Sequence, residues 1–344
     1  MLKYLALKNK KLTVFFCNIS CLPRFLVILY IYFISMKLQK TIKEPIEFEG
    51  VGLHNGINVK VCLKPAEANS GIVFKRVDVE DSKSIIKATY DNVSSAILCT
   101  KIENSQGVSI STIEHLMAAF YIEGIDNVLV EINAPEVPIM DGSAFDFVEA
   151  IRSFGAQEQK NSKKIIKVLK KVEINYGSKS VSIEPCEEDL IIDFEIVYNN
   201  PLIRTRKKEF KLSNGDLTSI YNSRTFCLYE DIEKIRSYGL AKGGSLENAI
   251  VVKENKILND DGLRNKDEFI SHKILDCLGD LMLSGYSIYG HIKTSQGGHH
   301  LTNLLLRKFL SDKSNWTFEI NEENQENQEK QKDSAYQRPI AVNV

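Results

Sequence analysis

Residues 46–63 carry the clearest structural signal in the chain, and they read IEFEGVGLHNGINVKVCL. Apolar and polar residues alternate over 46–49 and again over 57–63, and the glycine-rich segment 50–56 lies between these two runs. Alternation on both sides of such a turn is typical of two neighbouring strands. The segment therefore predicts a β-hairpin.

A similar pattern recurs in residues 172–185, which read VEINYGSKSVSIEP. Each hairpin is followed by further strands, a helix that contains a histidine, a glycine turn and another strand. We expect the helices at about 111–121 and 268–283, and the strands that follow them at about 127–132 and 287–292. Because the order of elements matches in both halves, the sequence predicts an internal duplication of an α+β unit.

The expected fold class is therefore α+β, with two similar units whose helices cover one face of a mainly antiparallel sheet. We place the first domain at 36–156, the linker at 157–164 and the second domain at 165–318. The two helix layers can face each other. Residues from both halves would then meet at one interface, which is a common place for an active site.

Length and composition limit the class of protein. The chain has 344 residues, 43% of them hydrophobic and 26% charged, which suits a globular protein of about two domains. The net charge of -1 gives no field that would attract a nucleic acid, so we expect no nucleic-acid partner. The seven cysteines form no C-x-x-C pair, and we expect a reducing, cytoplasmic location.

The two ends of the chain differ from its body. Residues 1–35 combine lysines with an apolar run at 25–34, and we interpret them as a doubtful extension: either Met36 is the true start, or the segment is a membrane-proximal anchor. The run is too short for a membrane span, which needs ~20 apolar residues, and no small-residue cleavage site follows it. Residues 319–344 form a polar tail that we expect to be disordered.

The strongest local signal for chemistry is the pair His272 and Asp276. On a helix these residues share one face, so both can reach one metal ion. A catalytic zinc site uses about three protein ligands, and His115 on the corresponding helix of the first half is the natural third. Its neighbour Glu114 could act as a general base. Spacing alone also allows ordinary pairing of these side chains.

Several ordered segments resemble the bacterial UDP-3-O-acyl-N-acetylglucosamine deacetylases, the zinc amidases of lipid A synthesis. The resemblance extends from about Gly50 to about Phe309. It rests on the segments GVGLHNG at 50–56, STIEHL at 111–116, NAPEVPIMDGSA at 133–144, SRTF at 223–226, KGGS at 242–245 and HKILDCLGD at 272–280. It implies two similar α+β units with the site between their helix layers.

The resemblance implies that His115, His272 and Asp276 hold the metal and that Glu114 is the general base. Zinc is the expected ion, and Fe²⁺ also suits two histidines and an aspartate. His299 would be the catalytic imidazolium, although a slip by one residue to His300 stays open.

Further roles follow from the same resemblance. Asp280 would orient His299 and keep it protonated, and Thr225 would donate its hydroxyl to the oxyanion. Lys273 would meet the nucleotide diphosphate of the substrate. The segment Asp141-Gly142-Ser143 predicts only a turn into a helix at about 144–151.

The segment 226–251 resembles the family insert that forms an apolar passage for the acyl chain. The possible lining residues are Phe226, Ile232, Ala241, Gly244, Ala249 and Val251. A side chain at Gly244 would narrow the passage. We assign no role to His54 and name no partner for His291.

We therefore predict a metal-dependent deacetylase that removes acetyl from UDP-3-O-acyl-N-acetylglucosamine. Its partner would be this small molecule, the protein would be a monomer, and a peripheral contact with the inner membrane stays open. One alternative is a non-catalytic protein that binds acylated sugar nucleotides. Another is a zinc hydrolase of a different amide, which the absence of an H-E-x-x-H motif disfavours.

Overall fold

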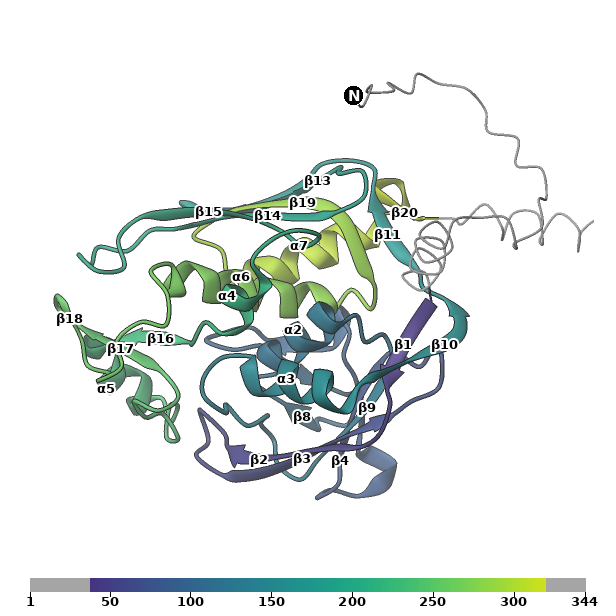
Figure 1. Cartoon of the computed structure of the whole chain (residues 1–344), viewed down its shortest axis with the longest axis horizontal. Helices are drawn as coiled ribbons and strands as arrows, with labels where there is room; N and C mark the ends of the chain where they lie inside the picture. The colour runs from purple at the N-terminus through teal and green to yellow at the C-terminus, as the bar shows by residue number, and fades with distance from the viewer. Residues whose placement is uncertain (1–37, 320–344) are drawn as a thin grey trace, which may run out of the picture. The chain divides into compact units, whose positions relative to one another are not determined.

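The structure is a computed structural model that describes residues 38–319 and contains both helices and sheets (Figure 1). The predictions for residues 1–35 and for the tail beyond residue 319 lie outside this range. Within the described range, every helix is too short or too polar to span a lipid bilayer. The five cysteines between residues 38 and 319 are free thiols.

A five-stranded sheet is built from the first half of the chain. Its strand order is β2-β3-β9-β4-β5. Strands β2 and β3 are antiparallel, with Ile46 opposite Leu63, which confirms the predicted hairpin. The strand after the first helix is β9, and it pairs antiparallel with β3 but parallel with β4. The bounds are β2 Ile46–Val51, β3 Asn58–Pro65, β4 Ile72–Arg76, β5 Ile85–Lys87 and β9 Val128–Ile132.

A seven-stranded sheet is built from the second half. Its main path is β12-β13-β19-β11-β20, and β14 joins β19 to β15. The pair β12 and β13 forms the second predicted hairpin, with Val172 opposite Ile183. Strand β19 runs parallel to β11 and β14. The bounds are β11 Ile165–Val168, β12 Val172–Tyr176, β13 Lys179–Glu184, β14 Leu190–Ile196, β15 Arg206–Lys211, β19 Ser287–Ser295 and β20 Trp316–Phe318.

Three small sheets complete the strand structure. Strand β1 pairs with β10, which includes most of the segment 157–164 that we expected to link the halves. The sheet β16-β17-β18 lies in the segment that resembles the family insert. The bounds are β1 Leu38–Ile42, β6 Val93–Ser95, β7 Lys101–Glu103, β8 Ser109–Ile110, β10 Ala156–Ser162, β16 Phe226–Leu228, β17 Ile250–Lys253 and β18 Lys256–Ile257.

Helices α2, α3, α4, α6 and α7 lie between the two large sheets in Figure 1, whereas α5 lies beside β16 and β17. Helix α3 contacts β2 of the first sheet, whereas α6 contacts β14 and α7 contacts β12 and β13 of the second. The α-helices are α2 Glu114–Glu123, α3 Phe145–Phe154, α4 Leu217–Tyr221, α5 Tyr229–Ser237, α6 Glu268–Met282 and α7 His299–Ser311, and the 3-10 helices are η2 Asp81–Lys83, η3 Tyr90–Asn92 and η4 Lys313–Asn315.

Helices α2 and α6 contact each other closely, and this contact brings the two halves of the candidate site together. A Cβ atom at Gly279 would lie 2.0 Å from the carbonyl oxygen of Glu114, so only glycine permits this approach of the two backbones. Every residue of α6 is buried except Lys273. Other elements therefore cover α6 on nearly all sides, among them α2, α4, α7, β14 and β15.

Helix α2 begins three residues later than predicted. Ser111 is held outside the helix because its N–H donates to the carbonyl oxygen of Pro135, and Thr112 has a φ of 56°. Helical backbone cannot continue through a residue in this left-handed conformation. The helix ends at Gly124, whose φ of 68° is typical of a glycine C-cap. Glu114 and His115 therefore occupy the first turn.

Candidate metal centre and active site

His115, His272 and Asp276 form a buried cluster on helices α2 and α6. One potential ligand atom from each lies within 4.8 Å of the others. Asp276 Oδ1 is 3.3 Å from His272 Nε2 and 3.6 Å from His115 Nε2. The two imidazole rings are nearly perpendicular, with centroids 5.0 Å apart. The structure thus brings together the three ligand types that the sequence analysis named.

The cluster fits a divalent metal ion. Ligand atoms held ~2.0–2.1 Å from one ion in tetrahedral geometry lie ~3.3–3.4 Å from one another. The two distances from Asp276 Oδ1, 3.3 Å and 3.6 Å, are close to this separation. His272 Nδ1 is 3.0 Å from the carbonyl oxygen of Ser223, and a proton on Nδ1 leaves the lone pair of Nε2 facing the cluster. Burial lowers the pKa of His272 to about 3, so its ring is neutral, the form that binds metals.

Lys273 lies against the cluster. Its Nζ donates to Asp276 Oδ2 at 2.8 Å. Burial alone would raise the pKa of Asp276, but the positive charges of Lys273 and His299 lower it well below its usual range, so the carboxylate is ionised. The Lys273 side chain keeps 23% of its surface exposed.

Glu114 and His299 flank the same cluster. His299 Nε2 is 3.8 Å from Glu114 Oε1 and 4.0 Å from Asp276 Oδ2. Burial raises the pKa of Glu114, although His299 and His115 oppose this effect. A carboxylate with a raised pKa is a stronger base than one in water. The arrangement therefore places a carboxylate and an imidazole beside the cluster of His115, His272 and Asp276.

Asp280 holds His299 in its position. Its Oδ2 is 2.8 Å from His299 Nδ1. Burial would lower the pKa of His299, but the carboxylates of Asp280 and Glu114 outweigh it and raise the pKa to about 10. His299 is therefore an imidazolium at neutral pH. His300 is exposed and lies near the ring of Tyr176, so only the first of these two histidines faces the cluster.

Thr100 is a residue of this site that the sequence analysis did not identify. Its backbone N–H donates to Glu114 Oε2 at 3.0 Å, and its hydroxyl donates to Asp280 Oδ1 at 2.6 Å. One buried threonine thus orients both the candidate base and the aspartate behind His299. Thr100 and Asp280 are 180 residues apart, and no local pattern in the sequence marks their contact.

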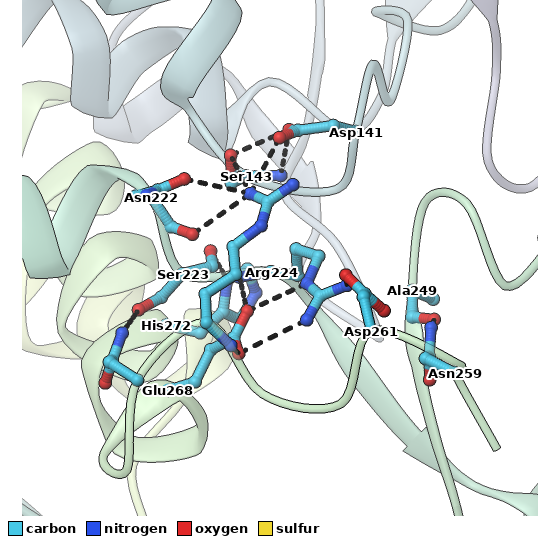
Figure 2. Close-up of polar contacts among 12 residues, drawn as sticks. Asp141, Ser143, Asn222, Ser223, Arg224, Ala249, Asn259, Asp261, Glu268 and His272 are labelled. Atoms are coloured by element: carbon cyan, nitrogen blue, oxygen red, sulfur yellow. Dashed lines mark hydrogen bonds and ion pairs between the residues drawn. The ribbon is translucent and has the colours of Figure 1, made fainter. Parts of the chain in front are cut away.

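Arg224 and Glu268 form a buried ion pair that fixes the loop beneath His272 (Figure 2). Arg224 Nε donates to Glu268 Oε1 at 2.9 Å, and Arg224 Nη1 donates to Asp261 at 2.8 Å. The backbone N–H of Arg224 also donates to Glu268. Because Ser223 precedes Arg224, this pair holds the carbonyl group that orients His272.

The turn Asp141-Gly142-Ser143 positions Thr225, although the sequence predicted only a route into a helix. The N–H of Thr225 donates to the carbonyl oxygen of Gly142 at 2.7 Å. Gly142 has a φ of 86°, and a Cβ atom there would lie 2.0 Å from the carbonyl oxygen of Asn248. The turn therefore requires glycine.

A cavity of about 460 Å³ lies in the segment that resembles the family insert. All six residues named from the sequence line it: Phe226, Ile232, Ala241, Gly244, Ala249 and Val251. A Cβ atom at Gly244 would lie 3.4 Å from the carbonyl oxygen of Ala241 and 3.6 Å from Leu53 Cδ1, which are ordinary contacts. Phe226 lines the cavity and also lies near the cluster, because its ring centroid is 6.4 Å from that of His272.

The structure also places the two histidines that had no expected role. His291 on β19 pairs with Asp193 on the neighbouring strand β14, at 2.9 Å between Nε2 and Oδ2. This partner is a strand neighbour that local sequence could not identify. His54 is buried and lines the cavity together with Thr225.

This α+β fold contains a buried cluster of two histidines and an aspartate, with a further carboxylate and an imidazolium beside it. Such a site is typical of a metal-dependent hydrolase. The family model described as UDP-3-O-acyl N-acetylglycosamine deacetylase matches residues 39–311. The chain therefore belongs to the UDP-3-O-acyl-N-acetylglucosamine deacetylase family.

Curated relatives agree with this assignment. The deacetylase of this name from Haemophilus ducreyi is 43% identical over 283 residues, which cover 81% of this chain and 92% of the relative. The one from Shewanella violacea is 44% identical over 84% of this chain and 95% of the relative. The one from Actinobacillus pleuropneumoniae serotype 3 is 41% identical over 83% and 94%.

Proposed function

We propose that this protein removes the N-acetyl group from a UDP-3-O-acyl-N-acetylglucosamine by hydrolysis and releases the free amine and acetate, as a step of lipid A synthesis. The family match over most of the chain carries this conclusion. The buried cluster of His115, His272 and Asp276 supports it. The relatives bear the name of this activity.

The metal would be held by His115, His272 and Asp276, and we propose zinc, with Fe²⁺ as the alternative. When bound, the ion supplies Lewis-acid chemistry, which activates water and polarises the acetamide carbonyl. Ser223 keeps the ring of His272 in the tautomer that such binding needs. Burial keeps that ring neutral over the physiological pH range.

Proton transfer would be divided between Glu114 and His299. Glu114 accepts a proton from the attacking water, and the N–H of Thr100 holds its carboxylate in place. His299 is charged before the reaction begins, so its Nε2–H can stabilise negative charge and then protonate the leaving amine. Thr225 would donate its hydroxyl to the same negative charge, which develops on the carbonyl oxygen of the acetamide.

Lys273 and the cavity would bind the remainder of the substrate. The side chain of Lys273 is partly exposed, and its positive charge would attract the diphosphate of the nucleotide. The cavity beside Phe226 would receive the acyl chain, because its lining is largely apolar. Residues larger than alanine at Gly244 would extend towards this space.

The direct test is acetate release by the purified, zinc-loaded protein acting on UDP-3-O-acyl-N-acetylglucosamine. We expect one acetate per free amine formed, loss of activity after metal removal with a chelator, and recovery when Zn²⁺ or Fe²⁺ is returned. Tight substrate binding without acetate release at stoichiometric zinc would instead identify a non-catalytic binding protein.

Asp280→Asn is expected to move the alkaline limb of the pH–rate profile to lower pH. Asp280, Glu114 and Asp276 are the charged groups that face His299, and the carboxylate of Asp280 contributes most to its raised pKa. Without that charge the pKa falls, so the active imidazolium is lost at a lower pH. The profile of kcat/KM against pH measures this shift. The matched control is Asp193→Asn, which alters the histidine–carboxylate pair at His291 and should leave the alkaline limb in place. An alkaline limb that does not move in Asp280→Asn would contradict the role of Asp280 in raising the pKa of His299.

The finer organisation of the fold is also part of the proposal. We infer that residues 36–156 and 165–318 are duplicated domains whose helix layers face each other around the site. The matching order of hairpin, helix and strand in both halves and the contact between α2 and α6 support it. From the sequence we keep a cytoplasmic location and a monomeric state.

A further inference from the structure

His54 is a buried histidine for which the protein supplies no hydrogen-bond partner. Its side chain is 8% exposed, and among residues 38–319 neither Nδ1 nor Nε2 has a partner. Buried polar atoms in proteins are nearly always paired, because an unpaired donor or acceptor costs free energy. His54 therefore differs from an ordinary core residue.

The backbone around His54 is fixed, so the loop cannot easily shift to give the ring a partner. Glu136 accepts the N–H of His54 and the N–H of Asn55, both at 2.8 Å. Gly52 makes this possible, because a Cβ atom there would lie 2.6 Å from Glu136 Oε2. The carbonyl oxygen of His54 accepts the N–H of Lys242 at 3.2 Å. The loop is thus held from both sides.

Glu136 does not partner the ring, because the hydrogen bonds that reach its carboxylate among the described residues come from other groups. Besides the two N–H groups, it accepts the hydroxyl of Thr112 at 2.8 Å through Oε1, the same oxygen that binds the N–H of His54. Thr112 lies two residues before Glu114. His54 is therefore linked through Glu136 and Thr112 to the start of α2, the helix that carries Glu114 and His115.

The ring lines the cavity that would hold the acyl chain, together with Thr225, Phe226 and Gly244. Burial lowers the pKa of His54, although Glu136 opposes this effect, so the imidazole is neutral at pH 7 and carries one N–H donor. A hydrocarbon chain offers nothing to this donor. The ester carbonyl that joins the chain to the sugar is an acceptor, and it is the polar group at the sugar end of the chain.

We propose that His54 is a substrate-binding residue whose ring N–H donates a hydrogen bond to the ester carbonyl of the 3-O-acyl group. This inference rests on the proposed function and adds a specificity to it: the site distinguishes an acyl ester from an alkyl chain of equal length. The loop that contains His54 would thus bind the polar end of the chain while its apolar neighbours bind the remainder.

The test compares two substrates, the 3-O-acyl ester and the corresponding 3-O-alkyl ether, which lacks only the carbonyl oxygen. Wild-type protein should prefer the ester by roughly tenfold or more in kcat/KM, as expected for one buried hydrogen bond. His54→Leu should lose this preference, because the ester falls roughly tenfold whereas the ether stays within about twofold. His54→Gln, which can still donate, should recover part of the preference, and thermal unfolding of each variant checks the fold.

Each result decides the proposal. Equal use of ester and ether by the wild-type protein overturns it even if His54→Leu does not fold. An equal loss for both substrates in a His54→Leu variant with a lowered unfolding temperature also overturns it and assigns His54 a structural role. Absence of acetate release from either substrate by the zinc-loaded wild-type protein would instead refute the proposed function, so the two failures are distinguishable.

Discussion

Replacing Asp276 with alanine is expected to remove bound zinc and deacetylation together. Asp276 Oδ1 is the atom nearest to both imidazole nitrogens of the cluster, so its loss leaves two ligands where a zinc site needs about three. Loss of a residue that only supports a ligand already costs ~10–100-fold in metal affinity, and we expect at least the upper end of that range. Elemental analysis and acetate release measure both effects.

The control for this variant is Asp193→Ala, which removes a carboxylate that also pairs with a histidine, His291. It should retain zinc and activity. His115→Ala should behave as Asp276→Ala does, because the two residues would hold the same ion from different helices. Stoichiometric zinc with full activity in Asp276→Ala would refute the ligand assignment.

Replacing Glu114 with glutamine is expected to keep zinc but to lower kcat by ~10²–10⁴-fold, the usual contribution of a general base. Glutamine has the shape of glutamate and can still accept the N–H of Thr100, so the fold around it should persist. It cannot accept a proton from water at neutral pH. Zinc analysis together with kcat and KM separates loss of the base from loss of the metal; Glu114→Ala should give the same pattern.

Glu123→Gln is a matched control on the same helix. Glu123 lies at the other end of α2 and pairs with Arg152, away from the ligand cluster. Its substitution should leave kcat unchanged. A fully active Glu114→Gln variant would show that another group accepts the proton.

The local elements of the fold could be predicted because each depends on residues that are near one another in the chain. The hairpin β2–β3 follows from alternation around a glycine-rich turn, and helix α6 follows from its apolar pattern. The predicted start of α2 was three residues early. The reason is tertiary: Ser111 donates its N–H to Pro135, a contact that lies outside the local pattern.

The candidate ligands and base could also be found from the sequence, because two of them share a helix face and the others lie in a family segment. The groups that support them could not. Thr100 and the pair of Arg224 with Glu268 act through contacts between distant segments. Glu136 likewise had no recognisable role until its three hydrogen bonds placed it between the His54 loop and the start of α2.

The sequence by itself determined the elements, the family and the types of residue available for catalysis, because periodicity, turns and motifs are properties of neighbouring positions. Only the tertiary structure decided the protonation states and the remaining partners. The raised pKa of His299 requires burial beside Asp280 and Glu114, and the unpaired ring of His54 requires a loop that Glu136 holds. Burial and electric fields depend on all the groups in a neighbourhood, and chain folding, rather than order along the chain, decides which groups those are.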